Sequence, residues 1–147
     1  MDSCIFAGIT SVIALFALIY NNRQANYRET RKEIRAKLDQ LNAALTTLLD
    51  SSNKYYLDKD ASLIIENVKI HGTINTCERS IEDLSNLNDG ISLKSDFYIL
   101  YDMITGGSFE SKTHKPNDHH ADHCKKISIQ KESLVAKAED WFNKMYR

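Results

Sequence analysis

Residues 3–22 read SCIFAGITSVIALFALIYNN and contain no charged side chain. A helix of this length spans ~30 Å, which matches the hydrocarbon core of a bilayer. A cleaved signal peptide needs a positive n-region and a small-residue cleavage site. Met1-Asp2 has no Lys or Arg, and Ala17-Leu-Ile-Tyr20 has no small-residue pair at the required spacing. A buried core helix would show a polar face. The stretch therefore predicts a single-pass transmembrane anchor over residues 1–22.

The charges on the two sides of this stretch are unequal. Asp2 is the only charged residue before it, whereas the residues after it are rich in Arg and Lys. The positive-inside rule then predicts an inner-membrane protein with its N-terminus outside and residues 23–147 in the cytoplasm. Basic side chains at this place can also rest on anionic head groups. The expected membrane-surface residues are Arg23, Arg28, Arg31, Lys32 and Arg35.

Small residues follow one face of the apolar stretch at spacings of three and four. Such faces let helices approach closely in lipid, which predicts a homo-oligomer held by Ala7, Thr10, Ala14 and Ala17. From Ile34 to Leu48, apolar residues recur at alternating spacings of four and three positions. This pattern forms an apolar seam of the kind found in helical bundles and coiled coils. The small stripe and this seam are nearly in phase. Nothing from Asn21 to about Leu49 breaks a helix, so we expect the transmembrane helix to continue directly into the first helix of the soluble region.

The rest of the chain predicts three further helices. One Pro and five Gly in 147 residues favour long helices over a turn-rich β fold. The first helix is expected to end at Asp50–Asn53, and a loop follows at Lys54–Lys59. The second helix is expected to run from a cap at Asp58 or Asp60 to about Asn88, with an apolar seam from Leu63 to Leu84 that Ile64 and Val68 widen. A short third helix capped by Ser92 or Ser95, a polar loop at Ser108–Asn117 and a last helix from Asp118 to about Tyr146 complete the chain. The predicted fold is all-α, with an antiparallel four-helix bundle over residues 23–147.

Four of the five histidines lie between His114 and His123. Histidines four positions apart on a helix can hold Zn²⁺, Ni²⁺ or Cu²⁺, and a cysteine adds a soft ligand. One hypothesis is therefore a metal site, with zinc as its cofactor, made from His119, His120, His123 and Cys124 and completed by His114 or a neighbouring subunit. The alternatives are a solvated, histidine-rich helix start without a cofactor and a pH-responsive interface.

Several function classes are disfavoured. No P-loop, GxGxxG, HExxH or Ser-His-Asp arrangement is present, so no enzyme is expected. The net charge of −1 lacks the basic excess of a nucleic-acid-binding protein. Three scattered cysteines fit a reducing compartment. Cys77 lies on the seam of the second helix and is expected to be a buried hydrophobic residue. His71 lies beside this seam and is expected to be half-buried and hydrogen-bonded.

An N-terminal anchor followed by a cytosolic helical bundle resembles small membrane effectors of bacterial antiphage systems, including CRISPR-associated accessory proteins whose bundles are similar to HEPN nuclease domains. The HEPN motif has an Arg followed closely by a His, and no Arg of this chain is followed in that way. The expected function is a non-enzymatic membrane protein that assembles through its span and bundle, as an effector, including the pore-forming and antiviral defence kinds, or as a scaffold. The alternatives are a membrane-tethered sensor or adaptor for a partner protein, such as the product of a neighbouring gene, and a metal-binding module using His114–Cys124.

Overall fold

The computed structural model describes residues 2–87, 90–111 and 114–146, with side chains from Leu15 onward except that of Asp118. These residues form four α-helices and no strand, which confirms the all-α prediction. The helices are α1 (Asp2–Leu57), α2 (Leu63–Leu87), α3 (Lys94–Thr105) and α4 (Ala121–Met145), and a short 3₁₀ helix, η1 (Asp118–His120), precedes α4.

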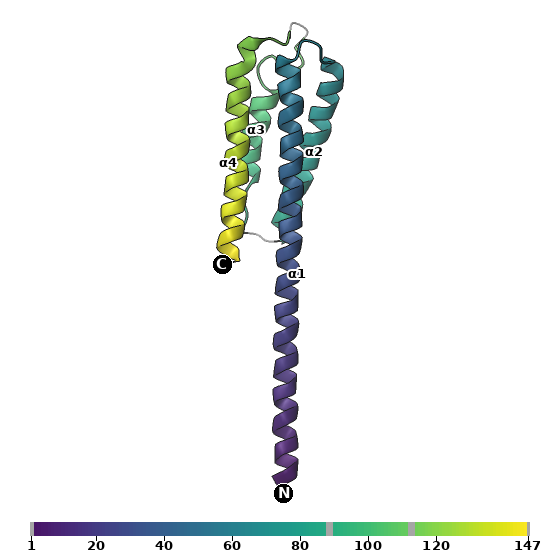
Figure 1. The fold of residues 1–147 in the computed structure, drawn as a ribbon, viewed down its shortest axis with the longest axis vertical. Coiled ribbons are helices and arrows are strands. Elements are labelled where there is room, and N and C mark those ends of the chain that lie inside the picture. The colour runs from purple at the N-terminus through teal and green to yellow at the C-terminus, as the bar shows by residue number, and fades with distance from the viewer. Residues whose placement is uncertain (1, 88–89, 112–113, 147) are drawn as a thin grey trace. The chain divides into compact units, whose positions relative to one another are not determined.

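The chain divides into two compact units, Met1–Ile34 and Arg35–Arg147, and each is described by itself. Within the second unit, successive helices run in opposite directions (Figure 1). The unit is a helical bundle, as expected. The expected division at residue 22 concerns the membrane and stays a prediction.

The core of the bundle follows the seams that the sequence shows. Leu38, Leu41, Leu45 and Leu48 of α1 are buried, and so are all the seam positions of α2 from Ile70 to Leu84. The other helices contribute Phe97, Leu100 and Ile104 from α3 and Ile127, Leu134, Ala138 and Phe142 from α4. Cys77 is fully buried, and burial raises the pKa of its thiol to about 12. The prediction that Cys77 is a buried residue is thereby confirmed.

The first helix is longer than predicted. It does not end at Asp50–Asn53 but continues to Leu57, so the loop predicted at Lys54–Lys59 begins four residues too early. The Oγ of Ser52 donates a hydrogen bond of 2.7 Å to the carbonyl of Leu48, which satisfies this buried hydroxyl inside the helix. Tyr55 and Tyr56 are both buried in the last turn. Their packing outweighs the helix-breaking tendency of the polar residues before them.

The second helix begins later than predicted and has a narrower buried face. Ile64 and Val68 were expected to widen the seam, but their side chains are 80% and 67% exposed. They precede Ile70 by six and two positions, and at about 100° per residue this places both on the far side of the helix. The third and fourth helices also begin without the predicted side-chain caps, since Leu93 and His120 hold the N-cap positions and neither forms a side-chain cap hydrogen bond.

In the part of the chain whose side chains are described, no helix has an apolar stretch long enough to cross a membrane. Residues 3–14 of the predicted span lie outside that part. The transmembrane anchor therefore stays a prediction.

Candidate functional site

Aromatic and imidazole rings gather where the last turn of α1 meets the loop after α3 and the first turn of α4. We call Tyr55, Tyr56, Phe109, His114, His120 and His123 the ring cluster. The His114 ring stacks on Tyr55, with centroids 4.6 Å apart and planes 12° apart. The Tyr56 ring has His120 and His123 at centroid distances of 5.3 and 5.0 Å. The cluster brings together residues far apart in the sequence.

His114 is the buried histidine of the cluster. Its Nε2 lies 3.1 Å from the carbonyl oxygen of Tyr55, and its Nδ1 lies 3.1 Å from the Oγ of Ser108. A carbonyl oxygen can only accept a hydrogen bond, so Nε2 carries the proton. In the neutral ring, Nδ1 then accepts the proton of the Ser108 hydroxyl. His114 therefore joins the loop after α3 to the last turn of α1.

A serine that donates to a histidine is also the arrangement of a nucleophile and its base. An acyl-transfer site needs free backbone N–H groups beside the serine to bind an oxyanion. Here the N–H groups of Phe109, Glu110 and Ser111 already donate to the Gly106 carbonyl, the Tyr55 hydroxyl and the Ser108 carbonyl. The Ser108–His114 pair therefore holds the loop in place. No sequence motif identifies the Ser108–His114 pair, because the other hydrogen-bond partner of His114 is the backbone carbonyl of Tyr55 and not a side chain.

Tyr56 ties the cluster to the end of α3. Its hydroxyl donates a hydrogen bond of 2.6 Å to the carbonyl of Ile104, and its own carbonyl accepts one from the N–H of Asn117. Burial raises the pKa of the Tyr56 phenol far above its usual value, so the hydroxyl stays protonated and remains a donor. The predicted loop at Ser108–Asn117 is thus attached to the last turn of α1 through Phe109, His114 and Asn117.

The four predicted metal ligands have different environments. His119 is exposed, His120 and His123 face the Tyr56 ring, and Cys124 is buried in α4 with the pKa of its thiol raised by burial. The helix begins at Ala121, so His119 is not four helical positions before His123. No group of three potential ligands among the described side chains could hold a metal ion. Zinc binding stays a prediction that this geometry does not favour.

We predict that the bundle loses stability on acidification because of the ring cluster. Burial, followed by the charges of His114 and His123, lowers the pKa of His120 below its usual value. As the pH falls through 6.5, the unfolded chain takes up this proton before the folded chain does, so the free energy of unfolding decreases. We expect the melting temperature to fall between pH 7.5 and pH 5.5, and His120→Gln to reduce the slope. An equal slope in His120→Gln would assign the pH effect to other groups, while His119→Gln is the exposed control.

His71 and Glu110 form a second contact between α2 and the loop after α3. The Glu110 carboxylate accepts hydrogen bonds of 2.9 Å from the Nδ2 of Asn67 and from the Nε2 of His71. These two bonds lower the pKa of the Glu110 carboxyl. His71 is half-buried and hydrogen-bonded, as expected. Glu110 adopts a φ of 58°, so the loop holds a non-glycine residue in a left-handed conformation.

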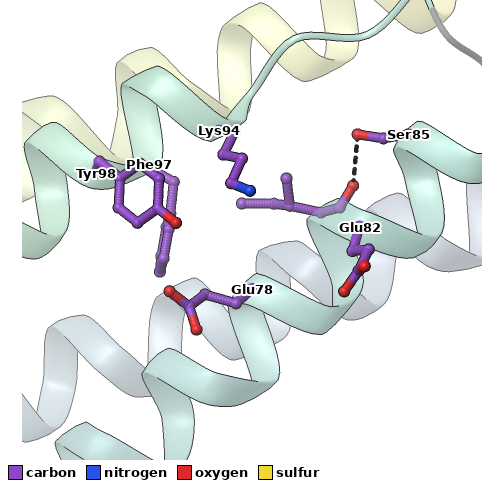
Figure 2. A pocket seen from close by; sticks show the side chains of 7 residues that line it. Glu78, Glu82, Ser85, Lys94, Phe97 and Tyr98 are labelled. Carbon is purple, nitrogen blue, oxygen red and sulfur yellow. Dashed lines mark hydrogen bonds between the residues drawn. The ribbon is translucent and has the colours of Figure 1, made fainter.

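A pocket of about 270 Å³ lies between α2 and α3, and Figure 2 shows its side chains. Glu78 and Glu82 line it from α2, while Lys94, Phe97 and Tyr98 line it from α3. The Lys94 Nζ is 5.9 Å from the centroid of the Tyr98 ring and lies between the two helices. Glu78 and Glu82 lie four positions apart, about one turn along α2 (Figure 2).

The predicted membrane-surface residues fall into two groups. Arg23, Arg28, Arg31 and Lys32 are exposed in the first compact unit. Arg35 belongs to the bundle, where it donates to Glu139 at 2.7 Å, pairs with Asp39 at 2.9 Å and lies over the Phe142 ring. These hydrogen bonds raise the pKa of the Arg35 guanidinium. Arg35 is thus paired within the bundle, and the membrane-surface assignment of all five residues stays a prediction. Of the predicted oligomerisation residues, Ala17 is exposed, while Ala7, Thr10 and Ala14 lie outside the described side chains.

Comparisons of the chain with known protein families, with curated proteins and with solved structures found no match.

Proposed function

We propose that this chain is a non-enzymatic, single-pass membrane protein that assembles into a homo-oligomer and serves as a membrane effector or scaffold. Residues 3–22 would form the anchor, and the helical bundle would lie in the cytoplasm. One observation carries the proposal, namely the exposure of large apolar side chains all round α1 between Leu15 and Tyr20.

The exposed apolar side chains surround this part of α1. Leu15, Phe16, Leu18 and Tyr20 are 61%, 68%, 66% and 63% exposed. Successive helical residues are about 100° apart, so these side chains surround the helix and do not form a stripe for one neighbouring helix. A helix that is apolar on every side is typical of a membrane span or a deeply buried helix. Each apolar square ångström left in water costs about 25 cal/mol, and lipid removes that cost on all sides at once.

Orientation and assembly follow from the flanks of the same helix. The exposed Arg23, Arg28 and Lys32 come directly after the apolar stretch, and positive charge on this side favours a cytoplasmic bundle. The stripe of Ala7, Thr10, Ala14 and Ala17 offers a close-packing face inside lipid. An oligomer formed there would place several bundles side by side, as a scaffold or an effector needs.

Two measurements on the full-length protein test this proposal. A carbonate wash should leave the protein in the membrane fraction, and cross-linking in mild detergent should give one discrete oligomer. Ala14→Leu should shift most of the cross-linked band to monomer, because the larger side chain separates the helices. Val12→Leu lies on the opposite face and should leave the oligomer unchanged. Recovery of the wild type in the wash would contradict anchoring, and a strict monomer would contradict assembly.

A second function is favoured by an exposed apolar patch on α2. Ile64, Ile65 and Val68 are all exposed at the start of that helix. Such a patch is typical of a contact surface for another protein. The chain could then be a membrane-tethered adaptor, in which the bundle recruits a partner protein. Overproduction that depolarises cells favours the effector, whereas overproduction without an effect on membrane potential favours the adaptor.

A further inference from the structure

Two shallow hollows lie on α1 at the end of the apolar stretch, and both border the hydrogen bond between Tyr20 and Gln24. The Nε2 of Gln24 donates to the hydroxyl of Tyr20 over 3.0 Å. One hollow is lined by Tyr20, Asn21, Gln24, Ala25 and Arg28. The other is lined by Tyr20, Arg23, Gln24 and Tyr27. Each hollow therefore contains a single arginine and shares the Tyr20–Gln24 pair.

The arginines of the two hollows are available to an external anion. Arg23 and Arg28 are exposed, and neither forms an ion pair with a residue that the structure describes. A guanidinium presents its donors in a planar fork that matches two oxygens of a phosphate. Gln24 lines both hollows and Asn21 lines one of them, and their side-chain amides can also donate to a phosphate. The lining chemistry of both hollows therefore fits a phosphate ester.

The apolar neighbours of the hollows identify which phosphate ester fits. Leu18 and Ile19, directly before Tyr20, are exposed and apolar. Tyr20 and Tyr27 are exposed too, and tyrosines are enriched where a helix passes from hydrocarbon to head groups. A phospholipid has acyl chains that cover the apolar side chains while its phosphate reaches the arginine. A free phosphate or a nucleotide leaves these apolar side chains in water.

We propose that the two hollows are head-group sites for anionic phospholipids, one site per arginine. This inference rests on the proposed membrane anchor, since the anchor sets the depth of Tyr20 and Arg23. Two features favour an anionic head group over a zwitterionic one. The segment from Arg23 to Glu33 has four basic and two acidic residues, and a zwitterionic lipid brings its own cation next to them. Attraction to anionic lipid is worth about 1 kcal/mol per basic residue near the surface.

Spin-labelled lipids test the proposal in vesicles that contain the full-length protein. The measured quantity is the association constant of labelled phosphatidylglycerol relative to labelled phosphatidylcholine at the protein surface. We expect a ratio of about 3 for the wild type and about 1 for the double variant Arg23→Gln, Arg28→Gln. Lys125→Gln, Lys126→Gln removes the same charge from exposed positions of α4 and should retain the wild-type ratio. Adding 0.5 M NaCl should reduce the wild-type ratio towards 1.

The outcomes separate this inference from the membrane anchor. A wild-type ratio near 1 in carbonate-resistant vesicles overturns the lipid sites and leaves the anchor standing. An equal loss in the Arg and Lys variants also overturns them, because net charge alone then explains the preference. If carbonate releases the protein, the flotation of the protein with lipid vesicles is measured in place of the ratio of association constants. Flotation with phosphatidylglycerol vesicles but not with phosphatidylcholine vesicles, abolished by the Arg variant, supports the sites without the anchor, and equal flotation or none overturns them.

Discussion

Replacing Leu15 and Phe16 with Arg is expected to release the protein from carbonate-washed membranes. An Arg near the centre of a transmembrane helix costs about 3 kcal/mol on the insertion scale, whereas Leu or Phe stabilises insertion by a few tenths. The double variant therefore loses roughly 7 kcal/mol of insertion free energy. We expect the wild type almost entirely in the floated membrane fraction and the variant mostly outside it.

The matched control uses the exposed apolar residues of the bundle. Ile64→Arg, Ile65→Arg introduces the same charges at positions that are exposed on α2. These side chains lie outside the proposed span, so this variant should float with the membrane like the wild type. If both double variants float equally, the side chains of Leu15 and Phe16 do not lie in hydrocarbon, and the proposed anchor is wrong. If neither floats, the added charge acts elsewhere than in the span.

The bundle seams were predictable because they are periodic within single helices. Leu38, Leu41, Leu45 and Leu48 repeat at spacings that fit one helical face, and the structure buries all four. The misplaced residues are those whose environment depends on phase or on distant segments. Ile64 and Val68 are apolar and close to the seam in sequence, yet their angle around the helix leaves them exposed.

The ring cluster could not be predicted from local sequence. Tyr55 and Tyr56 follow a polar run that usually ends a helix, and their burial depends on Phe109 and His114, more than fifty positions later. His114 itself lies in a polar loop with no periodicity, so nothing in its neighbourhood distinguishes it from the exposed His119. Likewise, Arg35 belongs to a basic run in the sequence, and only its contact with Glu139 of α4 assigns it to the bundle.

His114→Ala is expected to be the most destabilising single histidine substitution in the bundle. It leaves the buried Tyr55 carbonyl without its donor and removes the acceptor of the Ser108 hydroxyl. It also leaves a cavity where the imidazole stacks on the Tyr55 ring. An unsatisfied buried polar group costs about 1–3 kcal/mol, and the cavity adds to it. We expect the free energy of unfolding to fall by about 3 kcal/mol, seen as a melting temperature about 10 °C lower for the full-length protein in mild detergent.

Two further variants separate the contributions of His114. Ser108→Ala removes the loop hydroxyl but keeps the bond from Nε2 to the Tyr55 carbonyl, so it should cost about 1 kcal/mol. His119→Ala changes an exposed histidine in the same segment and should stay within about 0.5 kcal/mol of the wild type. The order His114, Ser108, His119 follows from burial and hydrogen bonding alone. Equal losses for His114→Ala and His119→Ala would mean that histidine content, and not the bond between the loop and the last turn of α1, stabilises this end of the bundle.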